Sequence, residues 1–372
     1  MRDVLTEVLT EVRGGTGFIT LNRPKALNAL SLTMIRDLSA ALLAWRNDPR
    51  IAAVAIRGVN KEGPFGAFCA GGDIRFFHQA VLTGNPELED FFTEEYTLNH
   101  LIHHYPKPYV AFLDGIVMGG GMGISQGSKL RIVTERTKMA MPETAIGLFP
   151  DVGGGYFLGR CPGRIGEYLA LTGVTIGAQD ALAAGLADVA LPSGGLPACW
   201  EALAAGPAAE LARLQGLAAT KSIAPDAHLV RTRGQIDHYF GLETVSAIMA
   251  ALEAGSTPWE AETAALLRKR SPLMLHVVLE QVRRGRTLAL ADDLRLERDM
   301  VHHCFHLRPG TAGETMEGIR AVAVDKDHRP RWNPSRVEEV TPEMVAPFFS
   351  SPWTAQDHPL RQLGADAATG AA

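Results

Sequence analysis

The sequence predicts an α/β fold followed by a mainly helical second half. Short apolar runs such as residues 110–113 have the length of buried strands. They alternate with segments such as residues 31–45, in which apolar side chains recur at helical spacing and would share one face. Beyond residue 193 the chain is rich in Ala, Leu and Arg, and its apolar residues recur mostly at helical spacing. These observations favour one sheet-containing part and one helical extension.

The first elements are a hairpin and a capped helix. Residues 4–12 and 17–21 read as two strands around a pair of glycines. Ser31 is a typical N-cap for the helix that follows it. A strand is expected at 51–57, and then a helix from residue 72 to about residue 81.

The stretch from 109 to 156 carries the clearest signals of function. A predicted strand at 110–113 leads into three consecutive glycines, 119–121, and a second predicted strand follows at 130–133. A Gly-rich turn that opens a helix leaves backbone N–H groups unpaired, and such donors bind phosphate or stabilise an oxyanion. Close packing of a helix on a strand is the alternative explanation. The pattern is not a P-loop, because no Gly-Lys-Ser/Thr follows.

A second Gly-rich turn has the same character. The segment A-F-C-A-G-G-D-I at 67–74 follows the predicted strand 51–57 and the loop 58–66. It also places small residues and exposed amides where a strand gives way to a helix. Two separate amide donors that converge on one point would form an oxyanion hole for a carbonyl substrate.

The A-F-C-A-G-G-D-I segment, the glycines 119–121 and the P-E pair at 142–143 together resemble the crotonase (enoyl-CoA hydratase/isomerase) superfamily. The resemblance implies a crotonase-like ββα spiral that binds an acyl-CoA with its carbonyl between two backbone amides. By position these are the amides of Cys69 and Gly120. The residues implied to contact the acyl-CoA are Lys25, Ala26, Leu27, Ala70, Gly71, Gly72, Asp73, Glu95, Gly120, Glu143 and Asp151.

Two of those residues also have simpler explanations. Lys25 could meet a phosphate of the coenzyme, or it could be a solvated surface charge. Asp73 lies at the start of a predicted helix, where an acidic side chain is favoured by the helix dipole and caps the first turn. For Asp73 the capping explanation is the stronger.

Within this superfamily the chain most resembles the 3-hydroxyisobutyryl-CoA hydrolases. Hydratases carry a glutamate two positions after the glycine triplet, where this chain has Gly123, whereas Glu143 is retained. The segment P-E-T-A-I-G-L-F-P-D-V-G-G-G-Y-F-L at 142–158 is similar to the hydrolase branch. So are the motif E-E-Y-x-L-N around Glu95 and the series E-G-x-R-A, D-K-D and P-x-W at 317–332.

This resemblance implies hydrolysis of the thioester of a short branched 3-hydroxyacyl-CoA, in particular 3-hydroxyisobutyryl-CoA from valine degradation. Glu143 would attack as nucleophile or activate water as general base. Asp151 would orient the substrate hydroxyl or the water, and Glu95 would fix the polar end. Glu143 could instead be a turn carboxylate and Asp151 a helix cap. An enoyl-CoA hydratase or isomerase and a non-catalytic acyl-CoA-binding protein are the alternative functions.

The domain prediction has three parts. Residues 1–192 form the acyl-CoA-binding catalytic domain, and residues 193–350 form a helical region packed on it. Residues 356–372 are expected to be a disordered tail.

Composition narrows the partners. The 372 residues are 46% hydrophobic and 21% charged, which is ordinary for a globular protein, and the net charge of −5 argues against nucleic acid. No apolar run approaches the ~18 residues of a membrane helix. The four cysteines lack CxxC spacing and read as the reduced thiols of a cytoplasmic protein. We expect no metal and no cofactor, since coenzyme A belongs to the substrate. A homo-oligomer is left open.

Overall fold

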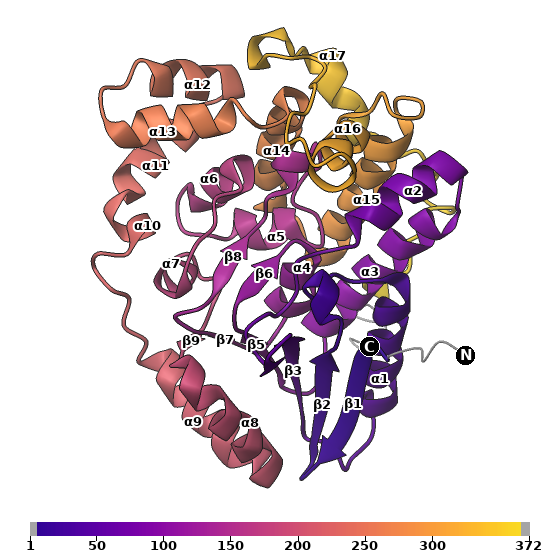
Figure 1. Ribbon diagram of the computed structural model, residues 1–372, viewed down its shortest axis with the longest axis vertical. Helices are drawn as coiled ribbons and strands as arrows, with labels where there is room; N and C mark the ends of the chain where they lie inside the picture. Colours follow the sequence, from indigo (N-terminus) through magenta and orange to yellow (C-terminus); the bar gives the residue numbers. More distant parts are fainter. Residues whose placement is uncertain (1–5, 366–372) are drawn as a thin grey trace. The chain divides into compact units, whose positions relative to one another are not determined.

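The computed structural model describes residues 6–365, and Figure 1 labels their helices and strands. The chain divides into two compact units. The described part of unit 1 consists of residues 6–72, 98–140 and 175–231. That of unit 2 consists of residues 73–97, 141–174 and 232–365. The division falls within helix α3 (Glu87–His103).

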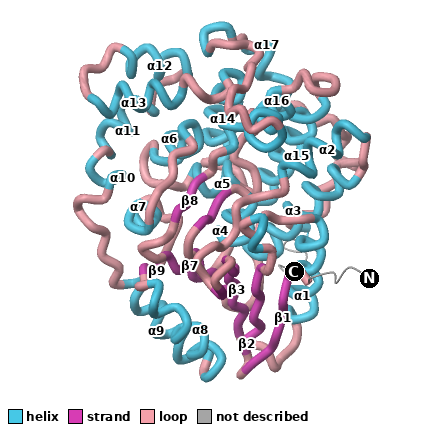
Figure 2. Tube along the Cα trace, viewed as in Figure 1, coloured by secondary structure: helices cyan, strands magenta, loops and turns pink. Residues whose placement is uncertain are grey.

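Unit 1 contains every strand assigned in residues 6–365, drawn in magenta in Figure 2. Seven strands form one sheet in the order β1-β2-β3-β5-β7-β9, with β4 paired to β3. The β1–β2 pair is an antiparallel hairpin, and the rest of the path is parallel. The strands of this sheet are β1 (Val8–Arg13), β2 (Thr16–Leu21), β3 (Ala53–Asn60), β4 (Gly63–Pro64), β5 (Tyr109–Leu113), β7 (Leu130–Val133) and β9 (Val189–Ala190).

The parallel strands are mostly apolar on both faces, as expected for a sheet that is covered on both sides. All five residues of β5 are buried, and Val110 pairs with Leu130 of β7. The largest buried side chain of unit 1 is Trp200, whose ring centroid lies 4.6 Å from that of Phe18 and 5.3 Å from that of Phe112. The core of the sheet therefore includes residues that follow position 193.

A second, two-stranded parallel sheet is formed by β6 (Ile116–Met118) and β8 (Lys138–Ala140). Helix α4 (Gly120–Gln126) begins directly after β6, with Gly119 as its N-cap at φ 48°. Glycine tolerates this left-handed conformation without a steric penalty. The small sheet therefore positions the first glycine triplet.

The other helices of unit 1 surround these sheets. They are η1 (Pro24–Ala26), α1 (Leu32–Arg46), α7 (Ala178–Ala183), η3 (Ser193–Gly195), α8 (Leu196–Ala205), α9 (Pro207–Ala219) and α10 (His228–Arg231). Ser31 caps α1, since its Oγ accepts from Met34 N at 3.2 Å.

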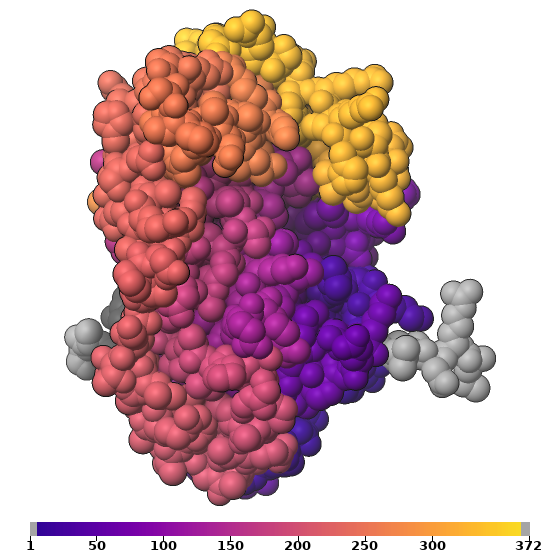
Figure 3. All heavy atoms as spheres, turned by 60° about the vertical axis from the view of Figure 1, so that its left-hand side comes forward, coloured from indigo at the N-terminus to yellow at the C-terminus, as the bar shows by residue number. Residues whose placement is uncertain are grey.

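Unit 2 is helical. Helix α14 is central to this unit and packs against α5 and α6. Figure 3 draws all atoms from the side of α12 and α13, which are shown in orange. The helices that lie wholly within unit 2 are α2 (Ile74–Thr83), η2 (Glu143–Ile146), α5 (Gly154–Gly159), α6 (Ile165–Thr172), α11 (Arg233–Phe240), α12 (Val245–Glu253), α13 (Pro258–Leu267), α14 (Pro272–Gly285), α15 (Leu290–His306), α16 (Glu314–Ile319), η4 (Arg320–Val324), η5 (Val337–Glu339), α17 (Pro342–Val345) and η6 (Ala346–Phe349).

The prediction of an α/β part and a helical second half is confirmed. The hairpin, the strand after α1 and the strands on both sides of the glycine triplet are all present. Residues 4 and 5 of the predicted hairpin lie outside the described residues. None of the helices in residues 6–365 combines the length and apolar character that crossing a bilayer requires.

The predicted domain boundary at 192 differs from the observed division of the chain. Residues 193–231 belong to unit 1, and one of them, Trp200, is buried in the core of the sheet. The packing of a 193–350 region on residues 1–192 stays a prediction. The predicted disorder from residue 356 does not hold for residues 356–365, which form turns with Leu360 only 2% exposed. Residues 366–372 of that tail lie outside the described residues.

Candidate active site

Glu143 occupies the first position of the short helix η2. Pro142 precedes it, and Gly147 ends the turn at φ 67° while donating its N–H to the Glu143 carbonyl. The side chain is only 6% exposed, and among the described residues its Oε2 has no hydrogen-bond partner. A buried carboxylate oxygen is normally satisfied, so an unpartnered one indicates a functional position.

Asp151 lies between Pro150 and the second glycine triplet, and it is also 6% exposed. Its Oδ2 accepts a hydrogen bond of 2.9 Å from the hydroxyl of Tyr96 on α3. Tyr96 is fully buried. The carboxyl group is therefore held in one orientation by a rigid aromatic donor.

Glu95, the neighbour of Tyr96 on α3, is 2% exposed, and its Oε1 has no partner among the described residues. Burial raises the pKa of Glu95 well above its ordinary value, and the charges of Asp151 and Glu143 raise it further. Unit 2 thus brings the three predicted carboxyl groups into one electrostatically coupled cluster.

The pKa values of the other two carboxyl groups, those of Glu143 and Asp151, are also raised. Burial raises the pKa of Glu143 well above its ordinary value, and the charge of Asp151 adds to this effect. Burial raises the pKa of Asp151 to about 6, although the hydrogen bond from Tyr96 works in the opposite direction. Strongly perturbed carboxyl groups in one buried cluster are typical of catalytic sites.

The loop after Asp151 is held by acidic side chains of α15. Glu297 accepts from the N–H groups of Gly153 at 2.7 Å and Gly155 at 2.9 Å, and Asp293 accepts from Tyr156 N at 2.8 Å. Glu297 also accepts from Gln281, which in turn donates to the carbonyl of Pro150 at 2.7 Å. The second glycine triplet therefore uses its amides to fix the segment that carries Asp151.

In unit 1, the predicted coenzyme-binding turn at 25–27 is joined to the Gly-rich loop at 67–74. The carbonyl of Leu27 accepts from Ala70 N at 3.0 Å. The Asn28 side chain donates to the carbonyls of Val59, Ala67 and Phe68 at 2.9–3.1 Å. Asn28 thus anchors this turn to the start of the loop.

The structure corrects the predicted role of Cys69. Its backbone N–H donates to Ile116 O at 3.0 Å, where the loop bridges to β6, so it is not available to a substrate carbonyl. Ala70 N is bonded to Leu27 O, as described above. Next along this loop are the amides of Gly71 and Gly72, for which no backbone partner occurs among the described residues of unit 1.

The first and second Gly-rich turns meet within unit 1. Gly71 has φ 107°, and a Cβ placed on it would lie 3.7 Å from the amide nitrogen of Gly120. Since only glycine adopts this conformation without strain, the loop can present bare amides beside that of Gly120. The Gly120 amide, which the sequence predicted as an oxyanion donor, therefore lies beside the predicted loop. The donor from that loop would be Gly71 or Gly72 and not Cys69.

The remaining predicted residues have positions that simple structural roles explain. Lys25 is exposed and Ala26 is half-buried in η1. Asp73 caps α2, since its Oδ1 accepts from Phe76 N at 3.3 Å. Gly123, where a hydratase would carry a second carboxylate, is buried within α4.

Sequence reasoning did not identify Tyr96 or Glu297 as contributors, and it gave Asn28, which follows the predicted coenzyme-binding residues 25–27, no anchoring role. The E-E-Y-x-L-N motif contains Tyr96 beside Glu95 and was the available signal for it. Glu297 lies 144 positions after Gly153, and no local pattern links the two.

Comparisons with known proteins agree with this architecture. The enoyl-CoA hydratase/isomerase family matches residues 16–349. A mitochondrial 3-hydroxyisobutyryl-CoA hydrolase from Gallus gallus is 40% identical over 93% of this chain and 89% of its own length. The expected cytoplasmic location finds no support in that relative, since its name places it in mitochondria.

Two solved structures are also similar. A carnitinyl-CoA dehydratase from Mycobacterium thermoresistibile has a TM-score of 0.84 and 40% identity, covering 92% of this chain and 96% of its own. An enoyl-CoA hydratase from Rhodobacter sphaeroides 2.4.1 has a TM-score of 0.84 and 39% identity, covering 93% and 98%. With its crotonase fold and the motifs described above, the chain belongs to the enoyl-CoA hydratase/isomerase family, in the branch that contains the 3-hydroxyisobutyryl-CoA hydrolases.

Proposed function

We propose that this protein hydrolyses the thioester of a short branched 3-hydroxyacyl-CoA, with 3-hydroxyisobutyryl-CoA, an intermediate of valine degradation, as its substrate. The observation that carries the proposal is the buried carboxyl cluster, in which Glu143 and Asp151 are retained while position 123 is glycine. A hydratase of this family uses a pair of glutamates to activate water and protonate carbon. This chain lacks one member of that pair.

Glu143 is proposed as the group that acts on the thioester carbon. It either attacks directly, which gives an acyl-enzyme anhydride that water then opens, or removes a proton from an attacking water. Its burial and raised pKa make it a stronger base than an exposed glutamate. The coenzyme A thiolate is a good leaving group, so the proposed step requires no strong acid.

The backbone amides of Gly120 and of Gly71 or Gly72 are proposed to polarise the thioester carbonyl. An amide donor that stabilises the tetrahedral oxyanion is worth about 3 kcal/mol. Asp151 is proposed to accept a hydrogen bond from the substrate 3-hydroxyl or from the water, with Tyr96 fixing its orientation. Glu95 completes the polar end of the site, and residues 25–27 are proposed to contact coenzyme A.

Hydration of an enoyl-CoA is the second candidate, because the two similar solved structures are described as a dehydratase and a hydratase. One assay separates the candidates: thiol release from 3-hydroxyisobutyryl-CoA, followed beside the absorbance loss of crotonyl-CoA. The hydrolase proposal predicts rapid thiol release and little change with crotonyl-CoA. The reverse result would indicate a hydratase. If neither thiol release nor loss of absorbance were observed, the protein would be a non-catalytic acyl-CoA-binding protein.

A further inference from the structure

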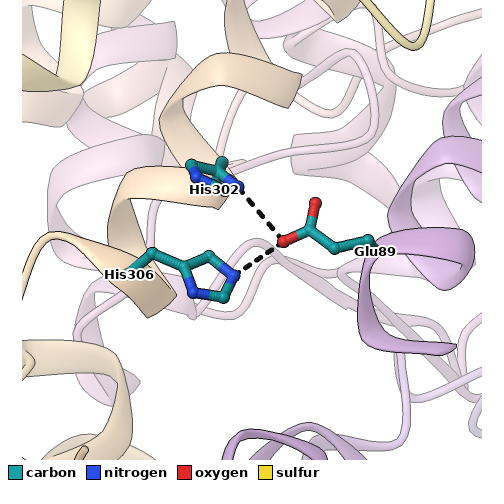
Figure 4. Close-up of side chains that lie close together, drawn as sticks. All are labelled: Glu89, His302 and His306. Carbon is teal, nitrogen blue, oxygen red and sulfur yellow. Dashed lines mark hydrogen bonds and ion pairs between the residues drawn. The ribbon is translucent and has the colours of Figure 1, made fainter. Parts of the chain in front are cut away.

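A second cluster of unit 2 consists of two histidines and one glutamate. His302 and His306 lie one turn apart on α15, and Glu89 lies in the first turn of α3. Figure 4 shows that both imidazole rings reach the same carboxylate oxygen. The distances to Glu89 Oε1 are 3.1 Å from His302 Nδ1 and 2.7 Å from His306 Nε2.

We propose that Glu89, His302 and His306 form a binding site for a divalent transition-metal ion of the Zn²⁺ class. One ligand atom from each residue lies within 4.8 Å of the others. In a tetrahedral zinc site with bonds of about 2.05 Å, ligand atoms lie roughly 3.3 Å apart. Small side-chain movements would therefore suffice to bind the ion. Two imidazole nitrogens and one carboxylate oxygen are a ligand set that zinc prefers.

The glutamate is prepared for this role by its surroundings. Arg298 pairs with Oε2 and donates from Nε to Thr93 at 3.0 Å. Because Arg298 occupies Oε2, it leaves Oε1 as the atom directed at the histidines, in the manner of an outer-shell partner.

One side of the cluster is covered and the other is open. The ring of Trp353 lies edge-on to that of His302, with centroids 4.9 Å apart, and it also stacks on Arg298. Glu89 and His306 line a surface pocket of about 340 Å³, to which Arg308 also contributes. Three protein ligands leave a fourth position on zinc, and a pocket beside two of them can admit the water or small anion that fills it.

The chain supplies its own comparison. His100 lies in the last turn of α3 and His104 in the turn that directly follows it, with ring centroids 4.2 Å apart and planes 32° apart. For His302 and His306 these values are 4.3 Å and 33°. Among residues 6–365, only the group with Glu89 brings three or more potential ligand side chains this close together.

The test uses untagged, chelator-treated full-length protein and two probes, Zn²⁺ by calorimetry and Co²⁺ by its visible absorption. We expect one saturable Zn²⁺ site per chain, a Co²⁺ spectrum typical of four-coordination, and a Tm that rises with Zn²⁺ concentration. His306→Gln should weaken Zn²⁺ binding about tenfold or more. His306 is partly exposed, so this variant should fold, whereas Glu89→Gln would leave the buried Arg298 without its partner.

The matched control is the double variant His100→Gln/His104→Gln, which should bind Zn²⁺ as the unaltered protein does. The absence of saturable Zn²⁺ binding and of a Co²⁺ band would overturn the proposal, because the cluster would then be only a histidine–carboxylate ion pair. So would Zn²⁺ binding that survives both His302→Gln and His306→Gln. Thioester hydrolysis is not part of this readout, so failure here leaves the proposed function untouched.

Discussion

Replacing Asp151 with asparagine is expected to stabilise the folded protein at neutral and alkaline pH. The carboxyl group is buried, and its pKa is raised from 3.8 to about 6. This rise corresponds to about 3 kcal/mol, at about 1.4 kcal/mol for each pH unit. The new amide NH₂ would be buried without an assured acceptor, which costs about 1–3 kcal/mol. The difference is a net gain of up to about 2 kcal/mol.

The sign of the effect follows from the two pKa values of the group. Because the folded-state pKa lies above the unfolded-state value, the ionised carboxyl destabilises the fold fully above about pH 6, and this penalty is absent below pH 3.8. The advantage of Asp151→Asn should be present at pH 8 and lost near pH 4. Urea unfolding of both proteins at the two pH values measures it.

A surface carboxyl provides the control for this experiment. Asp292 is 60% exposed and pairs with Arg295, so Asp292→Asn should change stability by no more than about 0.5 kcal/mol at either pH. If Asp151→Asn were less stable than the unaltered protein at pH 8, or equally stabilised at both pH values, the inferred buried negative charge would be wrong.

Three further predictions concern activity and fold. Asp151→Asn should lose the most rate on 3-hydroxyisobutyryl-CoA and the least on isobutyryl-CoA, because a site that hydrogen-bonds a hydroxyl discriminates through that bond; equal losses would remove the hydroxyl-reading role. Gly123→Glu should not hydrate crotonyl-CoA efficiently, since position 123 is buried within α4, and a hydration rate that rivals native hydrolysis would contradict this. Ser31→Ala should lower stability by about 1 kcal/mol through loss of the α1 cap while kcat stays unchanged, and an unchanged urea midpoint would argue against the cap.

Much of the fold could be predicted from local patterns. The strand at 130–133 was expected with its observed bounds, because its apolar run has the length and composition of a buried strand. Ser31 and Asp73 cap the helices that follow them, as their residue types and positions indicated. These features depend on short-range chemistry that the sequence carries directly.

The rest of the site depends on which distant segments meet. Tyr96 and Asp151 are 55 positions apart, and their hydrogen bond exists because α3 packs beside the segment that carries Asp151. The position of Cys69 in the motif made its amide a reasonable oxyanion donor, but the structure shows this amide donating to the carbonyl of Ile116 in β6. Its unavailability could not be read from a glycine-rich motif, because backbone hydrogen bonding between loops is a tertiary property.

The boundary at residue 192 illustrates the same limit. The helical spacing after that position predicted helices correctly, but it did not reveal what their apolar faces cover. Trp200 of α8 is buried against Phe18 of β2, so this helix belongs to the core of the sheet.

The most direct test of the proposed mechanism is the rate of thiol release by Glu143→Gln on 3-hydroxyisobutyryl-CoA. Glutamine keeps the size of the side chain and most of its hydrogen bonding, but it can neither attack the thioester nor remove a proton from water. We predict a kcat roughly 10³-fold lower than that of the unaltered protein, with acyl-CoA still bound. Full activity of Glu143→Gln would contradict the mechanism.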